Sequence, residues 1–181
     1  EFGGNDDYVR VDAGSFSSSE PWTFTQWMNW SGSSTFVFFA GISATGKGFL
    51  TRTSGSDLLY FRDTNRNYTY YGSNNAISNK EGFLCWVADG NGNLSVYVNG
   101  VFQESNSANT EMDFDLLGQG YSSGSGYSYT GTMHDVRIYD RALSPEEIGI
   151  LYKMTNPEST ERVSMSSDTL YTKGQIKEVI A

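Results

Sequence analysis

Short apolar runs separated by clusters of Gly, Asn, Asp and Ser fill residues 1–140, and this pattern constrains the fold most. The clearest runs are 83–87 and 94–98, which flank the sequence Asp89-Gly90-Asn91-Gly92. Gly, Asn and Asp tolerate the positive φ angles of a tight turn, so these two runs predict an antiparallel hairpin. About ten such runs at regular spacing predict an all-β fold with two packed antiparallel sheets.

The run that begins at Trp22 alternates in part. Strand geometry places every second residue from Trp22 to Met28 on one face and Trp27 on the other. The run 36–39 (FVFF) is apolar at both parities, as in a strand that is buried on both faces.

One short helix is predicted near the C-terminal end of these runs. Ser144 suits the N-cap, Pro145 the first helical position and Glu147 the third, which together form a capping box. Apolar residues then recur at helical spacing and would dock on the sandwich: Ile148, Leu151 and Tyr152. The pair 156–157 (Asn-Pro) ends the helix.

Charge and rare residues exclude several functions. The 181 residues contain 12 Lys and Arg against 21 Asp and Glu, a net charge of −9, which argues against nucleic acid as a partner. No stretch approaches the roughly 20 apolar residues that cross a membrane, so membrane insertion is not expected. The single Cys85 excludes an intramolecular disulfide, and the single His134 excludes a multi-histidine metal site.

Three segments, in order, resemble the laminin-G-like branch of the concanavalin A-like jelly rolls. They are residues 2–11 (FGGNDDYVRV), 89–100 (DGNGNLSVYVNG) and 131–148 (GTMHDVRIYDRALSPEEI). The resemblance implies a two-sheet jelly-roll sandwich over residues 1–155 whose first and last strands are adjacent. Two departures stand out: Leu84-Cys85 stands where the family often has a Trp-His pair, and His134-Asp135 replaces its Asp-Glu pair. Such folds serve lectins, adhesion modules, enzymes and structural proteins alike.

Three alternating acids are the feature of this sequence that would indicate an enzyme. Strand alternation would place Glu111, Asp113 and Asp115 on one face, as in the retaining glycosidases built on this jelly roll. The third acid is Asp where that pattern has Glu, and the following residues 116–118 resemble a laminin-G-like strand. A solvated acidic loop is therefore favoured, and the chain is predicted not to be an enzyme.

Two kinds of binding site remain. A glycan would stack on exposed aromatic rings in polar stretches; the candidates are Trp30, Tyr68, Tyr70, Tyr71, Tyr121 and Tyr127. A calcium ion is the one cofactor to consider, since many relatives bind it near the joined terminal strands; the candidate ligands are Asp6, Asp7 and Asp135.

Residues 156–181 are predicted to form a linker followed by a strand or hairpin. This tail either packs on its own domain or pairs with other copies of the chain through residues 164–181.

The function that these features favour is a non-enzymatic recognition or adhesion module that binds a glycan or a protein. The alternative is a structural subunit of a virion, fibre or surface filament assembled through the tail, and a glycoside hydrolase comes third. In each of the first two cases we expect an extracellular, cell-surface or virion-surface location.

Overall fold

The computed structural model describes residues 1–3, 7–11, 13–31, 36–41, 48–52, 58–63, 67–71, 81–118, 129–156 and 176–178. The strands are β1 (Phe2–Gly3), β2 (Val9–Arg10), β3 (Ser15–Phe16), β4 (Trp22–Trp30), β5 (Phe36–Gly41), β6 (Gly48–Arg52), β7 (Leu58–Arg62), β8 (Tyr68–Tyr71), β9 (Glu81–Ala88), β10 (Asn93–Val98), β11 (Val101–Ser107), β12 (Met112–Asp113), β13 (Leu116–Leu117), β14 (Thr130–Tyr139) and β15 (Ile176–Glu178). The helix α1 spans Pro145–Thr155.

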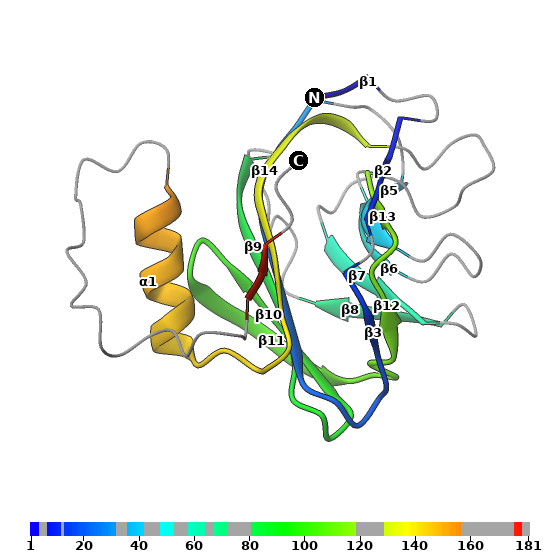
Figure 1. Ribbon diagram of the computed structural model, residues 1–181, viewed down its shortest axis with the longest axis vertical. Coiled ribbons are helices and arrows are strands. Elements are labelled where there is room, and N and C mark those ends of the chain that lie inside the picture. The colour runs from blue at the N-terminus through cyan, green and yellow to red at the C-terminus, as the bar shows by residue number, and fades with distance from the viewer. Residues whose placement is uncertain are drawn as a thin grey trace.

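The strands form two main antiparallel sheets that pack face to face (Figure 1). The seven-stranded sheet has the order β1-β14-β4-β9-β10-β11, with β15 also paired to β14. The six-stranded sheet has the order β2-β13-β5-β6-β7-β8, and β3 and β12 form a small separate pair. The predicted all-β jelly-roll sandwich with one short helix is thereby confirmed.

The central strand β4 is buried on both faces. Trp22, Phe24 and Met28 lie in the core between the two sheets, whereas Trp27 belongs to a second apolar cluster on the outer face. This is the division predicted from alternation. The outer face is apolar because α1 covers it, so the seven-stranded sheet lies between the helix and the second sheet (Figure 1).

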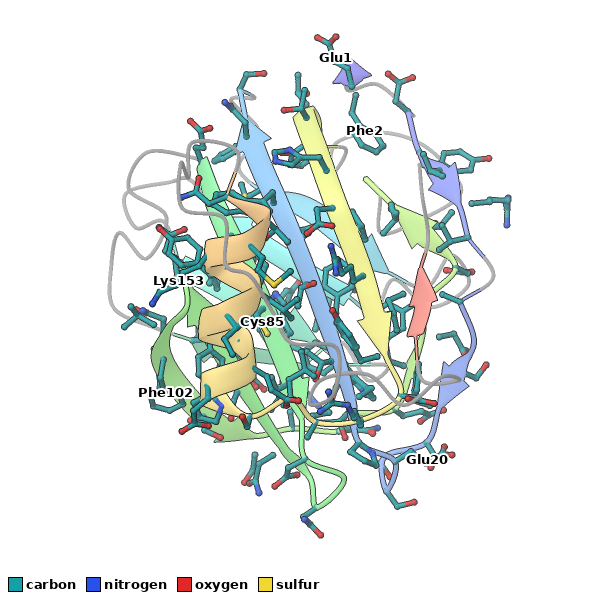
Figure 2. The ribbon with its side chains drawn as sticks, turned by 60° about the vertical axis from the view of Figure 1, so that its left-hand side comes forward. Glu1, Phe2, Glu20, Cys85, Phe102 and Lys153 are labelled. Atoms are coloured by element: carbon teal, nitrogen blue, oxygen red, sulfur yellow. The ribbon has the colours of Figure 1, made fainter. Side chains whose placement is uncertain are left out.

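The helix begins as its sequence predicts. The backbone N–H of Glu147 donates to the Ser144 hydroxyl, while the Glu147 carboxylate accepts the backbone N–H of Ser144. Ile148 and Leu151 are buried against the sheet and enclose Cys85, which lies under the helix (Figure 2). The indole of Trp27 donates to the Thr155 hydroxyl at 2.7 Å, which ties the other end of the helix to β4.

A hairpin turn lies at each end of β10, and the first of them is the turn predicted at Asp89-Gly90-Asn91-Gly92. Asp89 accepts the backbone N–H groups of Asn91 and Asn93 through Oδ1, at 2.7 and 3.0 Å, and closes the turn between β9 and β10. Asn99 and Gly100 adopt positive φ angles of 52° and 76° in the turn between β10 and β11.

Two distant segments of the chain pair with one strand. Phe2 lies opposite Gly131, so β1 and β14 are neighbours, as the resemblance implies for the first and last strands. Further along β14, Arg137–Tyr139 pairs with β15 of the tail. The tail therefore contributes a strand to its own domain.

Candidate ligand-binding site

The six predicted aromatic residues divide into three groups. Tyr68 and Tyr70 are exposed, with 42% and 53% of their surface accessible. Trp30 and Tyr71 are buried. Tyr121 and Tyr127 lie outside the described residues.

Trp30 and Tyr71 require a correction, because the structure places both in the core between the sheets. Trp30 ends β4 on the same face as Met28, so its ring continues the inward row of that strand. The ring of Tyr71 packs edge-on against Trp86 with centroids 5.3 Å apart, and burial raises the pKa of its hydroxyl well above the ordinary value. Neither side chain presents a surface to a ligand.

Tyr68 and Tyr70 lie instead on the outer face of the six-stranded sheet. In the register of β7 and β8, Tyr70 is opposite Tyr60 and Tyr68 is opposite Arg62. Cross-strand partners share a face, so these four residues form one continuous patch. We call it the tyrosine face, and it consists of Tyr60, Arg62, Tyr68 and Tyr70.

The rings of the tyrosine face hold one another in place. Tyr60 packs edge-on against Tyr70 at 4.7 Å and against Tyr68 at 6.2 Å between ring centroids. The guanidinium carbon of Arg62 lies 5.7 Å from the centre of the Tyr68 ring, within the range of a cation–π contact. Tyr60 and Arg62 are themselves buried, so two exposed rings rest on a rigid base.

A contact from the other sheet anchors the same patch. The Asn106 amide of β11 donates to the backbone oxygen of Tyr70 at 2.8 Å, which joins the edges of the two sheets. Tyr70 is thus held by its ring through Tyr60 and by its backbone through Asn106. An immobilised aromatic surface loses little conformational entropy when it binds a ligand.

Sequence reasoning identified Tyr68 and Tyr70 but missed Tyr60 and Arg62. Both belong to the run 58–62 (LLYFR). The alternation of this run indicates where they lie, because Leu59 and Phe61 face the core and Tyr60 and Arg62 must then lie on the opposite face. The cross-strand pairing with β8 could not be read from the sequence alone.

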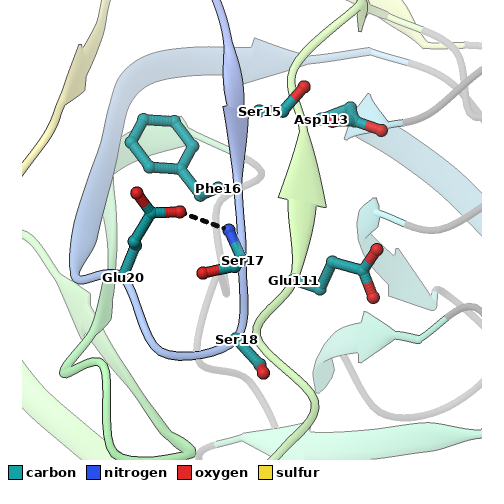
Figure 3. Close-up of a pocket in the computed structure, with 7 residues that line it drawn as sticks. All are labelled: Ser15, Phe16, Ser17, Ser18, Glu20, Glu111 and Asp113. Atoms are coloured by element: carbon teal, nitrogen blue, oxygen red, sulfur yellow. Dashed lines mark hydrogen bonds between the residues drawn. The ribbon is translucent and has the colours of Figure 1, made fainter.

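A second candidate site is a pocket beside the small sheet of β3 and β12 (Figure 3). It is an open pocket of about 440 Å³ whose lining residues are Ser15, Phe16, Ser17, Ser18, Glu20, Glu111 and Asp113. The backbone N–H of Ser17 donates to the Glu20 carboxylate at 2.8 Å, and this hydrogen bond lowers the pKa of Glu20. The pocket offers hydroxyl and carboxylate groups to a polar ligand.

The acidic triplet alternates as predicted. Met112 and Phe114 point into the core, whereas Glu111 and Asp113 are exposed and Asp115 is half-buried. Glu111 and Asp113 line the pocket, and Asp115 is not among its lining residues. Asp113 belongs to the short strand β12 and Glu111 precedes it, so the acids do not all fall in a loop.

The calcium candidates are engaged in other contacts where they are described. Asp7 accepts the backbone N–H of Gly3 at 2.7 Å, and Asp135 forms an ion pair with Arg137 at 2.7 Å. Asp6 lies outside the described residues. Within the described part of the chain, no group of three or more His, Cys, Asp or Glu residues could hold a metal ion. Calcium binding stays a prediction.

Comparison with known protein families identifies a match. The family model described as the concanavalin A-like lectin/glucanases superfamily matches residues 2–149. A search of curated proteins finds no match. Within the described residues, no helix is long and apolar enough to cross a membrane.

Solved structures with a similar fold include binding domains. A heptameric pentraxin from Limulus polyphemus has a TM-score of 0.63 at 14% identity, covering 82% of this chain and 76% of its own. The botulinum neurotoxin serotype D ligand-binding domain in complex with N-acetylneuraminic acid has a TM-score of 0.59 at 20% identity. The receptor-binding domain of the C/D mosaic toxin has a TM-score of 0.57 at 18% identity.

The match to the toxins is partial. It covers 82% of this chain and 39% of the serotype D domain, and 76% of this chain and 37% of the C/D mosaic domain. At these identities the likeness concerns the fold alone.

Proposed function

We propose that this chain, which belongs to the concanavalin A-like lectin/glucanase superfamily, is an extracellular, non-enzymatic recognition module that binds a glycan on its tyrosine face. The observation that carries the proposal is the pair of exposed rings, Tyr68 and Tyr70, fixed over Tyr60 on the outside of the sandwich.

The chemistry of a sugar suits this surface. A pyranose ring has an apolar C–H face that packs on an aromatic ring, and hydroxyls at its rim that need hydrogen-bond partners. Tyrosine supplies both a flat apolar ring and a polar hydroxyl at its edge. The two exposed rings are two residues apart on one strand, a separation of about 6–7 Å that allows contact with more than one sugar unit.

One further observation supports glycan binding without identifying the sugar. A structural neighbour at 20% identity is a toxin ligand-binding domain solved with N-acetylneuraminic acid. The polar pocket of β3 and β12 lies in a different part of the fold and is the competing candidate for a sugar site.

The test is a glycan array followed by titration of the best ligand. Replacing Tyr70 with Ala removes the most exposed ring, and we expect affinity to fall about tenfold, which corresponds to roughly 1.4 kcal/mol. Tyr70→Phe keeps the ring and should retain most of the affinity. Phe102→Ala is the matched control, since Phe102 of β11 (labelled in Figure 2) is an equally exposed aromatic that packs on Tyr97 of the other sheet.

Each other outcome has a defined meaning. Loss of binding in Asp113→Asn with no effect of Tyr70→Ala would move the site to the pocket of β3 and β12 and contradict the tyrosine face. Repeating the titration with EDTA tests the calcium prediction, because only a metal-dependent site would respond. Polysaccharide cleavage by the parent that Glu111→Gln abolishes would contradict the non-enzymatic part of the proposal.

A further inference from the structure

The edge of the seven-stranded sheet at β14 is covered by two separate short strands. β1 pairs with Thr130 and Gly131 at one end, and β15 pairs with Arg137–Tyr139 at the other. Among the described residues, no strand pairs with Thr132–Val136 on this edge. Within the described part of the chain, main-chain pairing thus occupies this edge of β14 at its two ends.

The strand that occupies one end is joined to the domain by a long connection. The helix is capped by Asn156, and β15 begins at Ile176. The connecting residues 157–175, if extended at about 3.3 Å each, could span roughly 60 Å. That reach exceeds the radius of a domain of this size by several-fold, so the same strand can meet the β14 edge of a neighbouring molecule.

We propose that the edge of β14 is an acceptor site for the tail strand of a second copy of this chain. The donated strand would take the register that β15 adopts here, with residue 178 opposite Arg137 and residue 176 opposite Tyr139. The tail that is displaced would in turn pair with the partner, or with a third copy in an open chain. This proposal is independent of the glycan site, since the tyrosine face lies on the other sheet.

Main-chain pairing explains why exchange costs little. The hydrogen bonds and cross-strand neighbours are identical whether the strand comes from the same molecule or from another. Only the covalent tether favours pairing within one molecule, because it gives the strand an effective concentration that is of about millimolar order for tethered segments in general. Exchange should therefore grow as the protein concentration approaches that range.

Cross-linking between two variants of the full chain measures exchange directly. The donor carries Glu178→Cys and the acceptor carries Arg137→Cys, because these positions are direct partners in the antiparallel register. Cα atoms of such partners lie about 4.5–5.5 Å apart, within the range that a disulfide bridges. The native Cys85 is fully buried and does not compete.

We expect a disulfide-linked heterodimer after mixing and mild oxidation, with a yield that rises with protein concentration. The control acceptor is Thr132→Cys, which lies on the same strand outside the pairing with β15 and should give no heterodimer. A third variant with both Arg137→Cys and Glu178→Cys reports pairing within one chain.

The result that overturns the proposal is an intramolecular disulfide in the double variant without any heterodimer in the mixture at millimolar concentration. Absence of both products would overturn it as well, because the edge would then not accept the tail strand at all. Circular dichroism of each variant establishes that the domain is folded before mixing.

Discussion

Substitution of Gly131 tests how closely β14 and β4 approach each other. Gly131 has φ of 137° and pairs with Trp30 of β4 and Phe2 of β1. A Cβ atom placed on it would overlap the backbone oxygen of Asn29. A backbone atom cannot rotate away as a side chain can, so Gly131→Ala must displace one strand from the other.

Two matched glycines separate this steric effect from backbone conformation. Gly92 also has a positive φ, of 83°, but a Cβ there meets no atom within 4 Å. Gly149 lies inside α1, where a Cβ again meets nothing within 4 Å. Gly149→Ala therefore changes only the helix propensity, and Gly92→Ala introduces only the cost of a side chain at positive φ. Gly131→Ala introduces that same cost and, in addition, the overlap of the new Cβ with the backbone oxygen of Asn29.

The expected changes in the free energy of unfolding differ in sign and size. Gly149→Ala should stabilise by up to about 1 kcal/mol, because Ala is the better helix former. Gly92→Ala should destabilise by about 1–2 kcal/mol through its positive φ. Gly131→Ala should destabilise by about 3–4 kcal/mol, since the φ cost is joined by the loss of one or two backbone hydrogen bonds at about 1 kcal/mol each.

Urea unfolding followed by tryptophan fluorescence measures all three variants, because Trp22, Trp27, Trp30 and Trp86 are buried in the native state. The comparison is valid when the slope of the free energy against urea is shared. If Gly131→Ala costs no more than Gly92→Ala, the close approach of β14 to β4 at this point is refuted.

Three further predictions concern the helix and its contacts. Ser144→Ala removes the N-cap hydroxyl and should cost about 1 kcal/mol in urea unfolding, and Ser144→Asp should restore most of it. The hydrogen bonds from Arg141 lower the pKa of Glu147 below its ordinary 4.5, so the stability that they contribute is present above that pH and is lost as the pH falls through the lower folded pKa. The free energy of unfolding of Glu147→Gln should therefore depend less on pH between 5 and 3 than that of the parent, and an unchanged profile would argue against the ion pair. Cys85 is fully buried and its pKa is raised, so an aromatic disulfide reagent should label it only at the rate of unfolding, and rapid labelling of the native chain would contradict this.

The predictable parts of the fold are those set by local sequence. The capping box at Ser144 and the turn at Asp89 depend on residues a few positions apart, and both occur as predicted. The parity of β4 was also readable, and extending it by two residues from Met28 would have placed Trp30 in the core. The burial of Trp30 thus follows from the alternation of β4 itself.

The binding surface was less predictable because it depends on pairing between strands. Tyr70 and Tyr71 are adjacent tyrosines in a polar stretch, and only the position of β8 beside β7 decides which one faces solvent. The pocket of β3 and β12 brings Ser15 next to Asp113, which no short-range pattern indicates. The sequence contains many residues that could bind a ligand, and the order of the strands in the sheets determines which of them are exposed side by side.

The position of β4 in the seven-stranded sheet also dictates an order of events during synthesis. One side of β4 pairs with β9, but its other side pairs with Gly131–Tyr139 of β14, near the end of the jelly roll. A chain still on the ribosome therefore has an unpaired edge along a tryptophan-rich strand until β14 has emerged. Contacts so distant in sequence form slowly, and open apolar edges invite aggregation. We therefore expect insertion of β14 between β1 and β4 to be a late step of folding, and chains that stop short of it to aggregate more readily.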